Sequence, residues 1–316
     1  MDVKGLWLKD TPAWCVCDGK QSPIARVFGA KWYDGEWLLP AYFPFGIFVW
    51  QDLQTLNDLT WDTQAQTHLE VVLRARAAWK DLEARGKTGP FELSAMFFPD
   101  GYPPFLHQQY GVLQIELWYR RLFLWQMGTG KTRTLIDGFR RLQEVGQFRR
   151  ALVLGPPVVL PGWHRELAKV AGSSWTAVHW DGTNEAAEKA KTAQLVTATY
   201  TRARLEATTV VDVGLGPKEI FTPEASRLRA LDYNVIVADE SHHIGNYEAA
   251  TTRAAIALGE VAARRYCLTG TAGVDPRGLY GQLRFLAPYL VESNYSKFCE
   301  RYLDFHPVRK HVVVGY

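Results

Sequence analysis

The sequence is poor in cysteine, in long apolar runs and in charge of one sign. Its four cysteines, Cys15, Cys17, Cys267 and Cys299, are too scattered for a disulfide framework in 316 residues, so we expect reduced thiols. No apolar stretch is long enough to cross a membrane, and the first residues lack the basic-then-apolar order of a secretion signal. A net charge of +3 does not by itself require a nucleic-acid partner. These absences argue against a disulfide-stapled secreted protein and against a membrane-spanning one.

From about residue 104 onward, apolar runs alternate with helical patterns. Short runs rich in strand-forming residues occur at 122–125, 151–154, 177–180, 195–198, 235–238 and 266–268. Helical patterns accompany them at 132–142, 162–170, 185–193, 247–263 and 276–287, and residues 214–223 are expected to form a loop insertion. This alternation predicts an α/β fold with a mostly parallel sheet and helices on both faces. Ligands of such sheets bind at the carboxyl ends of the strands.

A glycine-containing turn follows the first of these strands. Its residues are Gln126, Met127, Gly128, Thr129, Gly130, Lys131 and Thr132. A turn of this kind before a helix directs backbone N–H groups and the positive end of the helix dipole at phosphate. Lys131 can reach the β- and γ-phosphates of a nucleotide, and Thr132 offers a hydroxyl to Mg²⁺.

Two adjacent carboxylates, Asp239 and Glu240, follow another apolar strand about a hundred residues later. Asp239 can hold the same Mg²⁺, because Mg²⁺ prefers hard oxygen ligands. Glu240 is then placed to orient or deprotonate an attacking water. Either motif alone is also typical of an ordinary turn or a solvated loop. Their occurrence in this order, each after an apolar run, predicts a site for ATP and Mg²⁺.

Further motifs lie between and beyond these two. They are Phe105-Leu106-His107-Gln108, Leu152-Val153-Leu154-Gly155-Pro156-Pro157 with Trp163 and Glu166, Val196-Thr197-Ala198-Thr199-Tyr200, Asp239 to Asn246 with Thr252-Arg253, Leu268-Thr269-Gly270-Thr271-Ala272, and residues 295–302. In order and spacing, from about Pro104 to Tyr316, the chain resembles the first motor lobe of a superfamily-two helicase of the DEAD/DEAH-box type. The resemblance is closest to the Swi/Snf-type DNA translocases.

The resemblance implies a RecA-like fold and roles for particular residues. Gln108 would read the adenine edge, and His242 would couple the nucleotide site to the motif of residues 268–272. Thr269 and Thr271 would link the ATP state to the grip on DNA. The alternatives are a plain polar loop residue for His242 and hydrogen bonds to turn backbone for the two threonines. Pro156, Trp163 and Tyr200 are expected at the DNA; for Trp163 a packing role is an equal alternative.

The chain departs from the family pattern at several positions. Trp125 stands where the phosphate-loop pattern has its first glycine, and Gln126 stands where an acidic residue is usual. Ala272 replaces a proline, and Pro157-Val158 replaces a polar residue that would contact a DNA phosphate. The last change leaves backbone amides as the donors there.

Residues 1–95 have a different pattern, and we expect a small α+β accessory domain before the RecA-like lobe of 96–316. Strands are predicted at 13–17, 24–28, 31–33 and 36–39, with hairpin turns at Asp18-Gly19 and Asp34-Gly35, a helix at 63–84 and a linker at 85–90. The tryptophans of this region (Trp7, Trp14, Trp32, Trp37 and Trp50) either stack on nucleic-acid bases or form the core of a small sheet. The pattern resembles the HARP-type modules that precede some annealing helicases.

Superfamily-two motors use two RecA-like lobes, and the sequence contains one set of motifs. We therefore expect a second lobe in the full-length protein, little ATP hydrolysis by this chain alone, and a cytoplasmic or DNA-containing compartment without secretion or membrane attachment. The expected function is the ATP-binding part of a DNA-dependent ATPase that acts on duplex or branched DNA. An RNA helicase lobe and a non-motor nucleotide-binding module stay open; the Tyr200 strand motif and the residues after Asp239 favour DNA.

Overall fold

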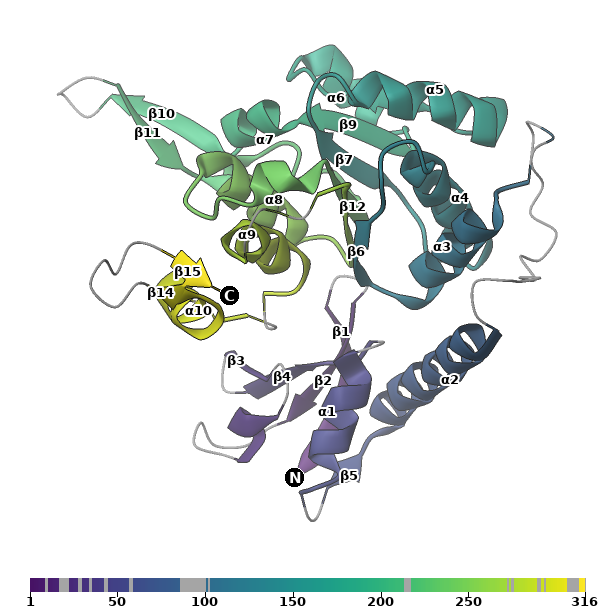
Figure 1. The fold of residues 1–316 in the computed structure, drawn as a ribbon, viewed down its shortest axis with the longest axis vertical. Coiled ribbons are helices and arrows are strands. Elements are labelled where there is room, and N and C mark those ends of the chain that lie inside the picture. Colours follow the sequence, from purple (N-terminus) through teal and green to yellow (C-terminus); the bar gives the residue numbers. More distant parts are fainter. Residues whose placement is uncertain are drawn as a thin grey trace. The chain divides into compact units, whose positions relative to one another are not determined.

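The chain forms two compact units, Met1–Ser94 with Phe105–Tyr119 and Ala95–Pro104 with Arg120–Tyr316 (Figure 1). The computed structural model describes residues 1–8, 11–16, 23–27, 30–33, 36–42, 45–56, 59–85, 101, 103–212, 217–271, 273, 276–288, 291–292, 294–305 and 313–315. Cys17, the two expected hairpin turns, the linker after residue 85, the boundary between residues 95 and 96, and Ala272 lie outside these residues. The two units are described separately below.

A six-stranded parallel sheet organises the second unit. Its strands are β6 (Arg120–Leu124), β7 (Ala151–Gly155), β8 (Ala177–His179), β9 (Leu195–Thr199), β12 (Val235–Asp239) and β13 (Arg264–Thr269). They pair in the order β6-β13-β12-β7-β9-β8, with every neighbouring pair parallel. All six expected strands are confirmed. Strands such as β7 and β12 are buried along their whole length, which explains why they are continuous apolar runs.

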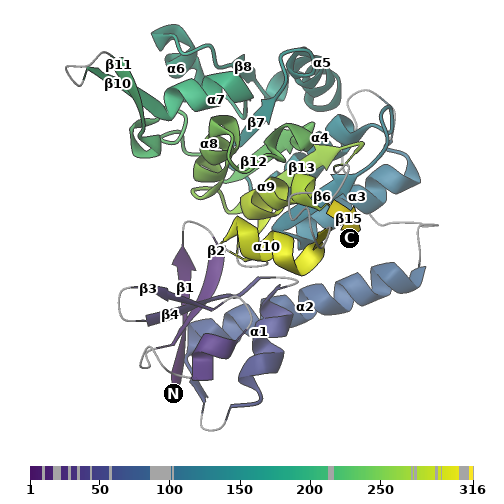
Figure 2. The same cartoon turned by 60° about the vertical axis from the view of Figure 1, so that its left-hand side comes forward.

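Helices cover both faces of this sheet. They are α4 (Lys131–Glu144), α5 (Leu160–Ala171), α6 (Asn184–Ala190), α7 (Tyr200–Glu206), α8 (Ala250–Gly259), α9 (Arg277–Leu286) and α10 (Tyr295–Tyr302). α4 packs on α5, while α7 packs on α8 and α8 on α9, and Figures 1 and 2 show these two groups on opposite sides of the strands. The RecA-like α/β arrangement expected from the sequence is therefore confirmed.

Three parts of the second unit differ from expectation. Where a loop insertion was expected, β10 (Thr208–Asp212) and β11 (Pro217–Phe221) pair as an antiparallel hairpin; residues 213–216 lie outside the described part of the chain. The α7 helix was not predicted, although Thr199 is its N-cap and accepts a hydrogen bond from the N–H of Arg202. The short strands β14 (Asp304–Phe305) and β15 (Val313–Gly315) form a further antiparallel pair.

The first unit is an α+β structure built on a mixed five-stranded sheet. Its strands are β1 (Asp2–Leu8), β2 (Thr11–Val16), β3 (Lys31–Tyr33), β4 (Glu36–Pro40) and β5 (Thr60–Trp61), in the order β3-β4-β2-β1-β5. Its helices are α1 (Phe45–Leu53), α2 (Thr63–Arg85) and α3 (Leu106–Leu117). The prediction of a strand at residues 24–28 is wrong, because Pro23–Arg26 form a 3-10 turn that buries Ile24.

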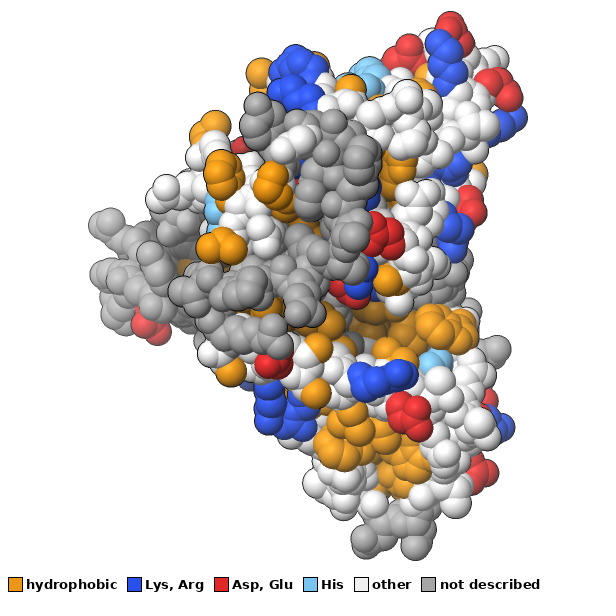
Figure 3. Space-filling model, turned by 90° about the vertical axis from the view of Figure 1, so that its right-hand side faces the viewer, with side chains coloured by type: hydrophobic (Ala, Val, Ile, Leu, Met, Phe, Trp, Pro, Cys, Tyr) orange, Lys and Arg blue, Asp and Glu red, His pale blue; other side chains and the backbone are white. Residues whose placement is uncertain are grey.

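Most tryptophans of the first unit belong to its core. Trp14 and Trp37 are buried, and Trp32 and Trp50 pack against the same apolar cluster. Trp7 differs, because 55% of its surface is exposed. The core interpretation is therefore confirmed for four of the five tryptophans named above, although apolar side chains still gather on part of this unit's surface (Figure 3). Within the described residues, no helix combines the length and the apolar character needed to cross a bilayer.

Gly281 of α9 permits a close contact with the turn that follows β12. A Cβ atom on Gly281 would lie 2.0 Å from the carbonyl oxygen of Ile244 and 3.0 Å from that of Gly245. We predict that Gly281→Ala lowers the free energy of unfolding by about 1–3 kcal/mol, because overpacking forces the backbone of this turn to shift. Urea denaturation followed by circular dichroism measures the change.

The matched control is Gly162→Ala in α5, where an added Cβ meets nothing within 4 Å. Alanine is the better helix former, so this control should unfold at the same or a higher urea concentration. Equal unfolding midpoints for Gly281→Ala and the unaltered protein would contradict the close-contact interpretation.

Candidate nucleotide-binding site

The loop between β6 and α4 takes its shape from two glycines. Gly128 and Gly130 have φ angles of 79° and 77°, a left-handed conformation that side chains with a Cβ atom rarely adopt. Gly130 is the N-cap of α4, so the helix starts at Lys131 with its unpaired N–H groups at the loop. Trp125 needs no such conformation, and its ring packs edge-on against Phe123 at 5.4 Å. The missing first glycine is therefore compatible with the loop.

Carbonyl groups of the loop backbone hold the side chain of Lys131 in place. Its Nζ donates to the carbonyl oxygens of Trp125 at 2.9 Å and of Gln126 at 3.2 Å. The Thr129 hydroxyl donates to the carbonyl of Gln126 at 2.8 Å, which closes the turn. The ammonium group therefore donates to neutral carbonyl oxygens. Negatively charged phosphate oxygens can replace these acceptors, because they form stronger, charge-assisted hydrogen bonds.

Asp239 ends β12 with its carboxylate fixed at both oxygens. Oδ2 accepts the indole N–H of Trp163 at 2.8 Å, and Oδ1 accepts the backbone N–H of Glu240 at 2.9 Å. Burial raises the pKa of Asp239, and the two hydrogen bonds and the charge of Lys131 act against that rise. The result is an oriented carboxylate near a cation, which suits a ligand of Mg²⁺.

Glu240 is the one described residue other than glycine with a positive φ angle, 48°. A residue with a Cβ atom in this left-handed conformation costs about 1–3 kcal/mol, and such strain concentrates at functional positions. The conformation places Glu240 next to Asp239 on the wall of one cavity.

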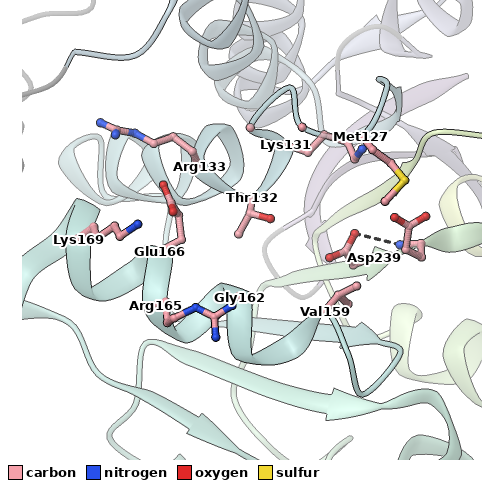
Figure 4. Close-up of a pocket in the computed structure, with 13 residues that line it drawn as sticks. Met127, Lys131, Thr132, Arg133, Val159, Gly162, Arg165, Glu166, Lys169 and Asp239 are labelled. Atoms are coloured by element: carbon pink, nitrogen blue, oxygen red, sulfur yellow. Dashed lines mark hydrogen bonds between the residues drawn. The ribbon is translucent and has the colours of Figure 1, made fainter.

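This cavity has a volume of about 470 Å³, within the usual range for small-molecule sites. It is lined by Met127, Gly128, Gly130, Lys131, Thr132, Arg133, Val159, Gly162, Arg165, Glu166, Lys169, Asp239 and Glu240. Figure 4 shows Thr132 from α4 and Asp239 from β12 across the same space. A hydroxyl and a carboxylate beside a phosphate-binding loop are the oxygen donors that Mg²⁺ accepts, so these residues fit ATP with Mg²⁺.

Sequence reasoning missed three cations of this cavity: Arg133, Arg165 and Lys169. Arg133 also bonds the buried Asp137 at 3.2 Å, whereas Arg165 and Lys169 are exposed on α5. Arg165 and Lys169 are four residues apart and therefore share a helix face. The sequence alone did not show that this face of α5 borders the loop.

The three expected coupling residues lie together beside Glu240. His242 Nδ1 is 3.2 Å from the Thr269 hydroxyl and 3.4 Å from Glu240 Oε2. The Thr269 hydroxyl donates to the carbonyl of Thr271 at 2.7 Å and accepts its N–H at 3.1 Å. A chain of polar contacts thus joins the end of β13 to Glu240, while the coupling role itself stays a prediction.

Two residues expected at the DNA are buried instead. Trp163 is fully buried, stacks on Phe139 of α4 and bonds Asp239; Tyr200 is 7% exposed and donates its hydroxyl to the carbonyl of Asp239 at 2.7 Å. Their side chains offer almost no surface to a nucleic acid, which favours the packing alternative for Trp163; a DNA contact by either residue stays a prediction. Pro156, directly after β7, keeps its position at the carboxyl edge of the sheet, and its contact with DNA stays a prediction.

Gln108 lies in the first unit, on α3. It is buried; its Oε1 accepts the N–H of Phe105 at 2.9 Å, and its own N–H donates to the carbonyl oxygen of Phe105 at 2.8 Å, at the start of the helix. Its expected contact with adenine stays a prediction.

A parallel sheet with this loop, strand-end carboxylates and flanking helices defines a RecA-like nucleotide-binding lobe. Residues 118–307 match the model of the SNF2-related domain, and the chain belongs to that family. It is 29% identical over 177 residues to a protein of Arabidopsis thaliana described as a probable ATP-dependent DNA helicase, CHR23, a match that covers 55% of this chain and 15% of that protein. The solved SWI2/SNF2 ATPase core of Sulfolobus solfataricus in complex with dsDNA has a similar fold, with a TM-score of 0.53 at 23% identity over 66% of this chain and 41% of that core. The chain thus spans less than half the length of either relative.

The position of Lys131 leads to a first prediction for this site. Lys131→Ala should weaken binding of ATP with Mg²⁺ by about 1.5–3 kcal/mol, because it removes a charged donor to phosphate. Thermal shift with and without nucleotide measures the effect. Lys189→Ala is the control, since Lys189 is exposed on α6 and pairs with Glu185. An ATP-induced shift of unchanged size in Lys131→Ala would rule out Lys131 as the phosphate lysine.

Proposed function

We propose that this chain is the ATP-binding lobe of a DNA-dependent ATPase that translocates on or remodels duplex or branched DNA. The observation that carries the proposal is the convergence of Lys131, Thr132, Asp239 and Glu240 on one cavity, from a loop, a helix and a strand end. Membership of the SNF2-related family supports it, as do the two relatives, one described as a probable ATP-dependent DNA helicase and the other an ATPase core in complex with dsDNA.

The residues divide the work of hydrolysis among themselves. The loop N–H groups and Lys131 bind the phosphates, while Thr132 and Asp239 would hold Mg²⁺, which neutralises phosphate charge when bound. Glu240 orients the attacking water and accepts its proton at the side-chain carboxylate. His242, at 3.4 Å from Glu240 Oε2, is placed to sense the state of that carboxylate and relay it to Thr269 and Thr271.

A second RecA-like lobe completes the proposed enzyme. Phosphoryl transfer in motors of this kind is accelerated by an arginine that reaches the γ-phosphate from the opposite side, by about 10³-fold or more. The described residues supply the loop side and the carboxylate side of the cavity. We therefore expect this chain alone to bind ATP weakly and to hydrolyse it negligibly, with or without DNA.

The other expectations follow from this proposal. DNA is expected at the carboxyl edge of the sheet near Pro156, and the protein is expected in the cytoplasm or a DNA-containing compartment. The first unit would be an accessory module; its mostly buried tryptophans argue against base stacking by those side chains. An RNA helicase lobe uses the same ATP chemistry, so nucleic-acid stimulation has to separate the two functions.

Phosphate release tests the proposed function directly. Joined to its second lobe, the protein should release phosphate faster with duplex DNA than with RNA, and Glu240→Gln should abolish release while ATP binding persists. Glu248→Gln, at an exposed position a few residues away, is the control. Stronger stimulation by RNA would favour the RNA helicase function. Robust release by this chain alone, removed by Glu240→Gln, would contradict the two-lobe mechanism.

Base specificity gives a separate prediction. Gln108→Ala should reduce the preference for ATP over GTP, because a glutamine amide can both donate to and accept from the adenine edge. Competition of each nucleotide against a fluorescent analogue measures the preference, and Gln109→Ala on the same helix is the control. The unfolding midpoint is needed in parallel, since Gln108 also caps α3. Undiminished discrimination in a folded Gln108→Ala protein would remove Gln108 from the adenine site.

A further inference from the structure

Asp239 is held at three points by hydrogen bonds. The backbone N–H of Glu240, the next residue in the chain, donates to Oδ1 at 2.9 Å. The other two donors come from separate helices: the Trp163 indole on α5 bonds Oδ2 at 2.8 Å, and the Tyr200 hydroxyl at the start of α7 bonds the main-chain carbonyl at 2.7 Å. The side chain and the backbone of one residue are therefore fixed by different parts of the sheet's surroundings.

The Trp163 contact is well suited to set the direction of the carboxylate. Trp163 is fully buried in the layer where α5 meets α4, with its ring 6.5 Å from that of Phe139 and nearly parallel to it. The indole has one polar hydrogen and gives it to Oδ2. In a site shielded from water such a bond is strong, and rotation of the carboxylate would leave two buried polar atoms without partners.

We propose that Trp163 is a positioning residue for the Mg²⁺-binding carboxylate of Asp239. The inference rests on the proposed function, because it needs Asp239 to be the metal ligand. Groups that orient a metal ligand through a hydrogen bond contribute about 10- to 100-fold to metal affinity or activity. Because α5 follows the Pro156-Pro157 segment, the contact also ties a stretch at the carboxyl edge of the sheet to the nucleotide site.

The test compares two variants in which a buried tryptophan is replaced by phenylalanine. Each substitution removes the indole N–H and keeps an aromatic ring. Trp163→Phe removes the donor to Asp239. Trp180→Phe is the matched control: Trp180 is 1% exposed, donates to the carboxylate of Glu206 at 3.1 Å and does not line the nucleotide cavity. Binding of a fluorescent ATP analogue to the 316-residue chain is titrated with Mg²⁺ and with EDTA.

In the unaltered chain, Mg²⁺ should tighten binding. In Trp163→Phe, the affinity measured with Mg²⁺ should fall about tenfold, while the affinity in EDTA stays within about twofold of the unaltered chain. In Trp180→Phe both affinities should be unchanged. A purely structural role for Trp163 would lower both affinities together, and equal Mg²⁺-dependent tightening in Trp163→Phe and the unaltered chain would overturn the proposal.

A measurement on the unaltered chain keeps the proposal testable if Trp163→Phe does not fold. The protein has 12 tryptophans, and labelling with ¹⁵N-tryptophan makes each indole N–H observable by NMR. Mn²⁺ in place of Mg²⁺, added with the ATP analogue, should broaden one buried indole signal first, and the proposal assigns that signal to Trp163. Loss of no buried indole signal, with nucleotide binding intact, would overturn it.

Failure of this inference can be told apart from failure of the proposed function. If the unaltered chain shows no Mg²⁺-dependent nucleotide binding, the proposed function itself is wrong. If that binding is present and Trp163→Phe leaves it intact, only the positioning role is wrong.

Discussion

The hydrogen bonds of Asp239 are the interaction on which the rest of the site depends. A carboxylate that is 6% exposed is costly unless its oxygens are paired, and here both are paired by N–H donors. One donor is the next residue of the chain and the other belongs to a helix packed on the sheet. The carboxylate of Asp239 therefore keeps its orientation in the cavity only while the relative positions of β12 and α5 are maintained.

The parallel sheet makes those places possible. β12 lies between β13 and β7, so the segments that follow these three strands all leave the sheet at the same edge. Thr269 at the end of β13 and Asp239 at the end of β12 are register neighbours offset by one pair, which brings His242 within reach of both Thr269 and Glu240. Residues of α4 and α5 line another part of the cavity wall.

Much of this could be predicted from the sequence, and the failures have physical causes. Strands such as β7 and β12 were predictable because they are buried along their whole length and so are continuous apolar runs. The loop was predictable because Gly128 and Gly130 adopt a left-handed backbone conformation that favours glycine. The direction in which the Trp163 side chain points could not be predicted, because it depends on which elements pack against α5. Only the fold shows that this face of α5 meets Asp239. The hairpin of β10 and β11 was missed, although Thr208–Val211 are all β-branched, because the glycines and prolines within residues 214–223 favour a loop.

The left-handed backbone at Glu240 has a consequence for how this protein can change. Glycine, and to a lesser degree asparagine, adopt that conformation with little strain, so either residue at position 240 would relieve a cost that glutamate imposes on the folded state. Selection for stability alone would therefore disfavour glutamate at this position. If Glu240 has the proposed catalytic role, a family member with glycine here would be more stable and would have lost turnover, a trade-off between stability and activity located in one residue.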